Sequence, residues 1–331
     1  MNELFQSVPF AVVLLIIGFA FLVKGADAFV EGCSSIAKRF RVPSIIIGMT
    51  IVAMGTSLPE TAVSITASIA GKNALAISNA VGSNIFNLMV VIGVCAILTP
   101  VAVQIGTLKK DIPLSLFCAG LLLVLGWIGM TLGHIDGAIF IVLFVLFILS
   151  MIKSAQKSRQ KQDGEALEVE ESELLQEAEE IKIMSVPKSL LYIVLGAVVI
   201  AVGSDWVVDG ASTIATAMGI SDNLIGLTVV AFGTSLPELV TSIVAAKKKD
   251  VDMALGNAIG SNIFNILMVL GIAGAISPML FIMENIIDII VLIVFTVIVW
   301  GMAWTKRELN KKEGFFMVIL YAAYVVYICI R

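Results

Sequence analysis

Charged side chains are scarce in this 331-residue chain, in which Asp, Glu, Lys and Arg together make up 14%. Soluble globular proteins contain about 25% charged residues. Apolar residues make up 59% of the chain, and its mean hydropathy is +1.04. A protein this apolar is not expected to stay in solution, which excludes a cytosolic enzyme and a nucleic-acid-binding protein.

Cysteine and histidine are also rare, with four Cys and one His in the whole chain. The cysteines lie in apolar stretches without CxxC spacing, so we expect small buried side chains and exclude a disulfide-built secreted domain. Because the single histidine, His134, lies in a predicted loop, no Ser/His or His/Glu metal constellation is present. We therefore predict that the protein is not an enzyme, and we expect no cofactor.

Long apolar runs fill most of the chain. A membrane-spanning helix needs about 20 mostly apolar residues, and these runs lack the alternation of a membrane barrel. We therefore predict an all-α membrane protein with ten transmembrane helices. The predicted spans are 8–30, 44–69, 74–98, 112–130, 136–153, 187–212, 223–246, 252–276, 284–303 and 314–330.

The Lys and Arg residues are distributed unevenly between the two sides that ten spans define. Eighteen of the 21 lie in one set of alternate loops, two lie in the other, and Lys24 lies inside the first span. Since cytoplasmic loops carry the excess of Lys and Arg, both termini are predicted to be extracellular. The polar segment 154–186, which holds nine acidic residues, is predicted to be a cytoplasmic linker. We expect a multi-pass protein of the plasma membrane with no obligatory protein partner.

The chain matches itself when it is shifted by 178 residues. Residues 55–60 and 233–238 both read GTSLPE, and residues 82–87 and 260–265 both read GSNIFN. From Gly25 to Gly93, 32 of 69 aligned positions are identical. Because each half holds five predicted spans, an odd number, the halves 1–153 and 187–331 are expected to have opposite orientations. Inverted repeats of this kind are typical of secondary transporters, which bind substrate near the midplane.

The duplicated blocks place polar residues at the centres of predicted spans. An ionised carboxylate at mid-membrane costs at least about 2.5 kcal/mol, and the local sequence around Glu60 and Glu238 offers no Lys, Arg or His. A bound cation or a proton is therefore the expected partner. Neighbouring residues at i,i+3 and i,i+4 can share a helix face with each other or with a glutamate. These are Thr56, Ser57, Ser83 and Asn87 in the first half and Thr234, Ser235, Ser261 and Asn265 in the second.

Pro59 and Pro237 are expected to break their helices, because proline cannot donate to the carbonyl four residues earlier. The freed carbonyls can then face a cavity instead of lipid. Carboxylate, hydroxyl, amide and carbonyl oxygens, without sulfur or imidazole, suit hard cations such as Ca²⁺, Mg²⁺ or Na⁺.

At these residues the chain resembles the cation/Ca²⁺ antiporter superfamily, and above all its prokaryotic sodium/calcium exchangers. The paired GTSLPE and GSNIFN blocks look like the α-repeats of that superfamily, and the resemblance covers nearly the whole chain. It implies Ca²⁺ extrusion driven by Na⁺ entry, with both ions as substrates at overlapping sites. It also implies central Ca²⁺ ligands at Glu60 and Glu238, Na⁺-site hydroxyls at the Thr and Ser positions above, and backbone carbonyls at Ala53 and Ala231.

Asn265 departs from those relatives that carry Asp at this position. The central site therefore has two carboxylates, and the resemblance implies that transport does not require K⁺. The main alternative is a Ca²⁺/H⁺ antiporter that uses the same two glutamates, although the repeated Thr-Ser pairs favour Na⁺. An ion channel is disfavoured because a closed two-carboxylate cage holds ions too tightly for fast conduction.

Overall fold

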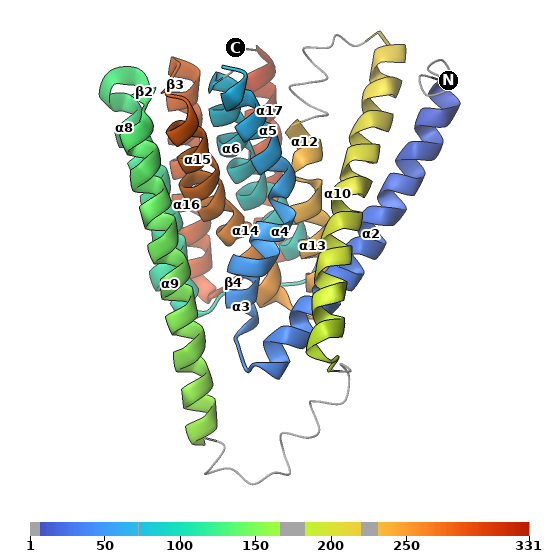
Figure 1. Ribbon diagram of the computed structural model, residues 1–331, viewed down its shortest axis with the longest axis vertical. Coiled ribbons are helices and arrows are strands. Elements are labelled where there is room, and N and C mark those ends of the chain that lie inside the picture. Colours follow the sequence, from blue (N-terminus) through green and yellow to red (C-terminus); the bar gives the residue numbers. More distant parts are fainter. Residues whose placement is uncertain (1–6, 72, 166–182, 220–230, 331) are drawn as a thin grey trace.

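A computed structural model describes residues 7–71, 73–165, 183–219 and 231–330. Within these ranges the fold is helical apart from four two-residue strands. The N- and C-terminal ends lie at the same end of the helical bundle (Figure 1). Eight described helices are long and apolar enough to cross a membrane, and Ser44–Thr56 with Leu58–Ile69 forms a further candidate span bent by 51°. The protein is therefore a multi-pass membrane protein, as predicted.

The elements are labelled α for α-helices, β for strands and η for short π- or 3₁₀-helical segments. The N-terminal half contains α2 (Val8–Arg39), α3 (Ser44–Ile47), η1 (Gly48–Val52), α4 (Ala53–Thr56), α5 (Leu58–Ile69), α6 (Asn73–Phe86), η2 (Asn87–Val91), α7 (Ile92–Leu98), η3 (Thr107–Asp111), α8 (Ile112–Trp127), η4 (Ile128–Met130) and α9 (His134–Glu165). The C-terminal half contains α10 (Val186–Ala217), α12 (Ala231–Thr234), α13 (Leu236–Lys247), α14 (Val251–Phe264), η6 (Asn265–Val269), α15 (Leu270–Ile276), α16 (Met283–Lys306) and α17 (Lys311–Ile330). Antiparallel pairs join β1 (Val101–Ala102) to β4 (Glu308–Leu309) and β2 (Thr131–Leu132) to β3 (Met279–Leu280).

Over their described residues the predicted spans coincide with helical structure, but several helices extend beyond the predicted ends. α2 continues to Arg39 and α9 continues to Glu165. The first part of the predicted linker is therefore helical, because Lys, Gln and Arg after residue 153 are good helix formers. Residues 166–182 of that linker lie outside the described residues, as do residues 223–230 of the seventh predicted span.

Helices α2 and α10 pack along their length through glycines. A Cβ atom added at Gly25 would lie 2.9 Å from the backbone nitrogen of Ile200, and one added at Gly203 would lie 2.8 Å from the carbonyl oxygen of Gly18. Small residues of this kind let two helix backbones approach closely in a membrane. The two helices run side by side at one flank of the bundle (Figure 1).

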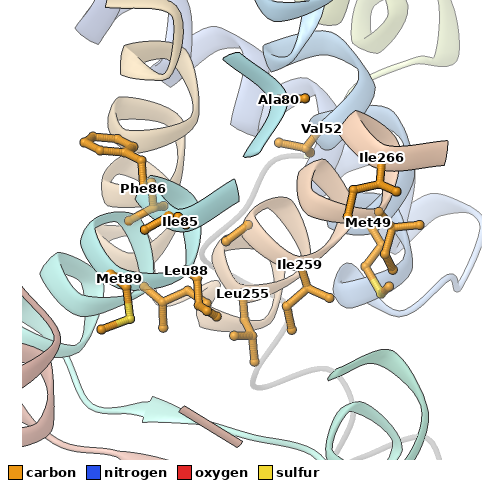
Figure 2. Packing of buried hydrophobic residues seen from close by; sticks show 14 of the residues in the cluster. Met49, Val52, Ala80, Ile85, Phe86, Leu88, Met89, Leu255, Ile259 and Ile266 are labelled. Atoms are coloured by element: carbon orange, nitrogen blue, oxygen red, sulfur yellow. The ribbon is translucent and has the colours of Figure 1, made fainter. Parts of the chain in front are cut away.

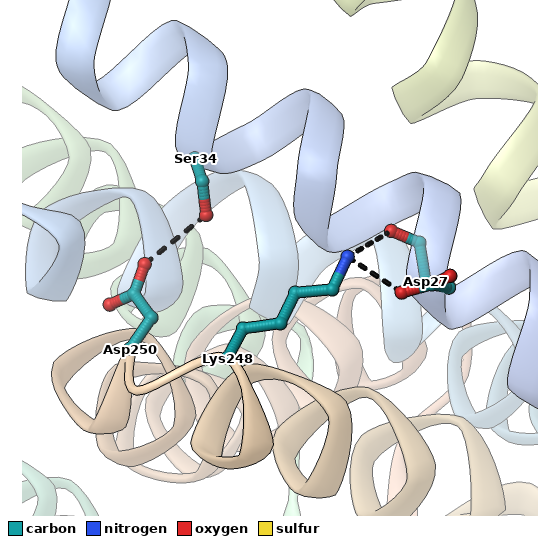
Figure 3. Close-up of polar contacts among 4 residues, drawn as sticks. All are labelled: Asp27, Ser34, Lys248 and Asp250. Atoms are coloured by element: carbon teal, nitrogen blue, oxygen red, sulfur yellow. Dashed lines mark hydrogen bonds and ion pairs between the residues drawn. The ribbon is translucent and has the colours of Figure 1, made fainter. Parts of the chain in front are cut away.

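Polar contacts attach α2 to the turn between α13 and α14 (Figure 3). The Lys248 ammonium lies 2.6 Å from the Asp27 carboxylate and also donates to the Asp27 carbonyl oxygen at 3.1 Å. The Ser34 hydroxyl donates to the Asp250 carboxylate at 3.2 Å. Asp27 therefore makes an interhelical contact at the end of its span.

The core lies where η1, α6 and α14 meet, and Figure 2 shows part of this packing, including Met49, Ile85 and Ile259. The closest approach is between η1 and α14. A Cβ atom at Gly48 would lie 2.5 Å from the Met253 carbonyl oxygen. This contact fixes α14 against the first half, next to the broken span α4–α5.

Gly260 and Gly82 occupy equivalent positions in the two halves but have different surroundings. A Cβ atom at Gly260 would lie 2.5 Å from the Met49 Cα atom, whereas one at Gly82 would meet nothing within 4 Å. We expect Gly260→Ala to lower the free energy of unfolding by about 1–3 kcal/mol, because backbone must move to make room. Thermal unfolding in detergent measures this loss. Gly82→Ala is the matched control, and an equal loss in both variants would contradict the packing argument.

Candidate functional site

Two broken helices position the candidate site. α4 ends at Thr56 and α5 begins at Leu58, while α12 ends at Thr234 and α13 begins at Leu236. The intervening serines have backbone angles outside the α-helical range, with φ −84° and ψ 15° at Ser57 and φ −95° and ψ 5° at Ser235. The predicted breaks before Pro59 and Pro237 are confirmed, since proline offers no N–H to continue the helical pattern.

Both glutamates are completely buried, and each accepts a hydrogen bond from a serine of the opposite half. Ser57 Oγ donates to Glu238 Oε1 at 2.7 Å, and Ser235 Oγ donates to Glu60 Oε1 at 3.1 Å. Each of these serines also contacts a serine of the GSNIFN block in the other half. Ser57 and Ser261 lie 3.1 Å apart, and Ser235 and Ser83 lie 3.1 Å apart, measured between their hydroxyl oxygens. The two halves therefore share one polar cluster.

This cross-pairing differs from the simplest reading of the spacing. The i,i+3 relation placed Ser57 on the same helix face as Glu60, in its own half. The observed partner of Ser57 is Glu238 instead. The reason is that the helix breaks at Ser57, so helical face relations do not hold across this residue.

The second oxygen of each carboxylate has no partner in the described part of the molecule. Glu60 Oε2 and Glu238 Oε2 are buried and accept no hydrogen bond there. Neither glutamate forms an ion pair with a described Lys, Arg or His; the described ion pair, between Lys248 and Asp27, lies at another place. Because a buried uncompensated charge is unstable, each glutamate requires a cation or a proton.

The other predicted hydroxyl and carbonyl positions surround the breaks. Thr56 is buried, and its hydroxyl donates a hydrogen bond to Asn257 Oδ1 at 3.1 Å. The Ala53 carbonyl already accepts the Ser57 N–H at 3.1 Å. Thr234 is also buried, and Ala231 is the first described residue of α12. These positions therefore lie at or next to the two breaks.

Asn87 and Asn265 are buried and begin the equivalent π-helical segments η2 and η6. Such segments occur frequently at functional sites. Their surroundings differ, because Asn265 Nδ2 donates to Asn84 Oδ1 at 3.1 Å, whereas neither side-chain atom of Asn87 has a partner within the described ranges. The side-chain oxygen of Asn265 is also without a partner there. Both amide oxygens are thus available to a cation.

The sequence reasoning missed four asparagines that hold the cluster together. Asn79 Nδ2 donates to the Glu60 carbonyl at 3.3 Å, and Asn257 Nδ2 donates to the Glu238 carbonyl at 3.3 Å. Asn84 and Asn262 also donate reciprocally to each other's backbone carbonyls, at 3.0 and 3.1 Å. The signal was present, because all four residues are identical between the halves at the 178-residue offset.

Asn257 connects more groups than its counterpart Asn79. It donates to the Glu238 carbonyl and to Ser242 Oγ at 2.9 Å, and it accepts from Thr56 of the other half. We expect Asn257→Ala to lower the free energy of unfolding by about 1–3 kcal/mol, because buried polar groups lose their partners.

Thermal unfolding of Asn257→Ala and Asn79→Ala, side by side, tests this expectation. Asn79 donates to the Glu60 carbonyl and to Ser64 Oγ at 3.0 Å, but it has no described contact across the halves. We expect the larger loss of stability for Asn257→Ala, and a larger loss for Asn79→Ala would show that the contact across the halves contributes little.

The atoms gathered here are carboxylate, hydroxyl and amide oxygens. No group of three or more His, Cys, Asp or Glu side chains that could hold a metal occurs among the described residues. The cluster therefore differs from the sites that bind zinc or copper, and its oxygens match the preference of Ca²⁺ and other hard cations.

A cavity of about 620 Å³ lies between α5, α10 and α12 and extends to Thr234, next to the polar cluster. Its lining includes Pro59, Ser204, Asp205 and Asp209. Two acidic residues thus face a cavity that ends at Thr234, the residue before the break at Ser235.

The comparisons with known proteins identify the family. Residues 10–153 and 188–330 match the family described as sodium/calcium exchanger protein. The chain is 41% identical to the putative antiporter CaxA of Alkalimonas amylolytica, over 81% of each chain. It is 34% identical to the sodium/calcium exchanger MaX1 of Methanosarcina acetivorans, over 95% of this chain and 97% of that protein.

A solved structure of the sodium-calcium exchanger NCX_Mj, soaked with 2.5 mM Na⁺ and 10 mM Sr²⁺, has the same fold. The two structures superpose with a TM-score of 0.81 at 32% identity, covering 97% of this chain and 99% of that one. The resemblance seen in the paired sequence blocks is confirmed. The chain belongs to the sodium/calcium exchanger family.

Proposed function

We propose that this protein exchanges Na⁺ for Ca²⁺ across a membrane by alternating access. The observation that carries the proposal is the pair of buried glutamates, Glu60 and Glu238, each with one oxygen held by a serine and one oxygen without a described partner. A divalent cation between the two carboxylates compensates both charges. In the stage of the transport cycle that carries Na⁺, monovalent ions at overlapping positions compensate the same two charges.

The ligands in this proposal are the two glutamates and the oxygens around them. Glu60 and Glu238 bind Ca²⁺ directly, with the amide oxygens of Asn87 and Asn265 nearby. The proposed Na⁺ ligands are the hydroxyls of Thr56, Ser57, Ser83, Thr234, Ser235 and Ser261 and the carbonyls of Ala53 and Ala231. Hydroxyls and carbonyls are neutral oxygen donors, which suit a monovalent hard cation.

Transport is proposed to be independent of K⁺. Asn265 supplies a neutral amide where some relatives carry a third carboxylate, so the site has no additional negative charge for a further monovalent cation. The amide is also engaged, because it donates to Asn84.

We propose that the molecule consists of two inverted five-helix repeats, residues 1–153 and 187–331, joined by the cytoplasmic linker 154–186. The reciprocal bonds between the halves support this arrangement, as does the position of both termini at the end opposite the linker-proximal ends of α9 and α10 (Figure 1). From the distribution of Lys and Arg we infer that the termini are extracellular, and we propose that the protein lies in the plasma membrane.

The test is ⁴⁵Ca²⁺ uptake into proteoliposomes that are loaded with Na⁺ and diluted into Na⁺-free buffer. A parallel set without Na⁺ carries a pH gradient. The proposal predicts uptake with the Na⁺ gradient, no uptake with the pH gradient alone, and no effect of K⁺. Uptake with the pH gradient alone would replace Na⁺ by H⁺ as the driving ion at the same two glutamates.

A further inference from the structure

A basic pocket lies at one end of the bundle, away from the cation cluster. It has a volume of about 400 Å³ and lies between η3, with the residues just before it, and the end of α16. Its lining residues are Ile105, Leu108, Lys109, Trp304, Thr305, Lys306 and Arg307. Three cations thus surround one pocket, and no acidic residue contributes to its lining.

None of these cations is neutralised by the described part of the protein. Lys109, Lys306 and Arg307 are exposed and form neither an ion pair nor a side-chain hydrogen bond there. Lysine and arginine side chains attract anions with charge-assisted hydrogen bonds, and arginine binds phosphate with two parallel bonds. The pocket is therefore suited to an anion supplied from outside the protein.

The walls of the pocket are fixed by hydrogen bonds. Trp300 Nε1 donates to the Leu108 carbonyl at 2.8 Å and ties α16 to η3. The Val103 N–H donates to the Arg307 carbonyl at 2.8 Å, next to the β1–β4 pair. The three cations are thus carried on a rigid frame, which favours a defined binding site over a diffuse basic surface.

The opposite end of the molecule repeats the strand pair, as β2–β3, and its neighbouring backbone bond without the cations. There the Phe281 N–H donates to the Met130 carbonyl at 2.9 Å, as Val103 does to Arg307. The strand pairs align β4 with β2 at an offset of 177 residues and β1 with β3 at 178, so Lys306, Arg307 and Lys109 correspond to Gly129, Met130 and Ile287. A tryptophan is retained, as Trp127. The fold therefore does not require cations at this place. They belong to the excess of Lys and Arg on this side of the protein, and what distinguishes them is that three of them line one pocket with no acidic residue.

The surroundings of the pocket indicate a lipid. Trp304 is 52% exposed and Ile105 is 48% exposed, so apolar surface adjoins the cations at the end of two spanning helices. Tryptophan is enriched at the level of lipid headgroups, and basic pockets between spanning helices on the cytoplasmic side bind anionic headgroups. We propose that this pocket binds the phosphate headgroup of an anionic phospholipid, whose acyl chains lie along α8 and α16.

The test uses the tryptophan in the pocket as the probe. Purified protein in phosphatidylcholine micelles is titrated with brominated phosphatidylglycerol, which quenches nearby tryptophan fluorescence. The Trp304→Phe variant identifies the Trp304 signal. The proposal predicts saturable quenching of Trp304 by brominated phosphatidylglycerol at mole fractions where brominated phosphatidylcholine quenches little.

The decisive comparison is between two triple variants with equal charge loss. Lys109→Gln/Lys306→Gln/Arg307→Asn removes the cations of the pocket, and Asn is used because it tolerates the φ of 54° at position 307. With about a fivefold contribution from each cation, the relative affinity for phosphatidylglycerol should fall about a hundredfold. Lys153→Gln/Lys157→Gln/Lys247→Gln, on exposed positions elsewhere, should retain the wild-type affinity.

Three results would overturn the proposal. They are unchanged quenching in the pocket variant, an equal loss in the control variant, and displacement of the lipid by inorganic phosphate at equal concentration. The second result would indicate general surface charge, and the third would indicate a soluble anion as the ligand. If the triple pocket variant elutes as an aggregate, the three single variants replace it in the same titration. Each single variant is expected to weaken phosphatidylglycerol binding about fivefold.

Discussion

Glu60→Gln and Glu238→Gln are each expected to abolish Na⁺-driven Ca²⁺ uptake, with initial rates reduced at least about a hundredfold. Each substitution keeps the size of the side chain and removes one of the two charges that a divalent cation compensates. Each variant keeps one carboxylate and gains one neutral amide, so the site carries one negative charge instead of two. It should bind Ca²⁺ far more weakly than the wild type, because charge attraction is strong in a buried site. Initial ⁴⁵Ca²⁺ uptake rates in proteoliposomes measure the effect.

The same variants should remain folded. Since each one removes a buried charge that has no described basic partner, we expect their thermal stability without Ca²⁺ to equal or exceed that of the wild type. Added Ca²⁺ should raise the melting temperature of the wild type but not of the variants, because a ligand stabilises only the protein that binds it. Glu284→Gln, at an exposed position near the start of α16, is the control. Wild-type uptake in Glu60→Gln or Glu238→Gln would refute the site.

Asn265→Asp is expected to change the cation preference of transport. In the wild type the Asn265 amide donates to Asn84 Oδ1 at 3.1 Å. An aspartate cannot donate this bond unless it is protonated, and it places a third carboxylate beside the cluster. A further buried charge costs at least about 2.5 kcal/mol unless it is compensated, so an additional cation should become necessary.

We expect Ca²⁺ uptake by Asn265→Asp to fall at least about tenfold in K⁺-free buffer, in line with this cost, and to recover when K⁺ is added. Asn265→Ala is the matched control, because it removes the same hydrogen bond without adding charge and should show no K⁺ sensitivity. Uptake rates at a series of K⁺ concentrations make the comparison. An unchanged ion profile in Asn265→Asp would show that charge at this position does not determine cation preference.

The breaks in the two helices could be predicted from the sequence, because they depend on a local property. Pro59 and Pro237 lack an N–H group wherever the rest of the chain lies. The burial of Glu60 and Glu238 followed similarly from their place within long apolar segments. Both predictions needed only the residues within one turn or one span.

The pairing of groups across the halves could not be predicted in this way. Spacing along one helix says which side chains share a face, but Ser57 bonds to Glu238, which lies on a different helix. The difference between Gly82 and Gly260 has the same origin, since identical sequence blocks meet different neighbours. The ends of helices were also missed where helix-forming polar residues extend a span, as at Arg39 in α2.

Asn79 and Asn257 show that some missing information was in the sequence after all. They are identical between the halves and precede the GSNIFN blocks by a few residues, yet an asparagine in an apolar run has no obvious ligand role. In the structure they bind the backbone carbonyls of the two glutamates. Their role is to position the glutamates, which repetition alone could have suggested.

In the proposed mechanism Glu60 and Glu238 form one shared site for which Na⁺ and Ca²⁺ compete. Equilibrium ⁴⁵Ca²⁺ binding to the purified protein, at increasing Na⁺ concentrations, tests it most directly. We expect saturable binding that Na⁺ displaces, and no specific binding in Glu60→Gln/Glu238→Gln. Ca²⁺ binding that persists in the double variant, or that Na⁺ does not affect in the wild type, would contradict it.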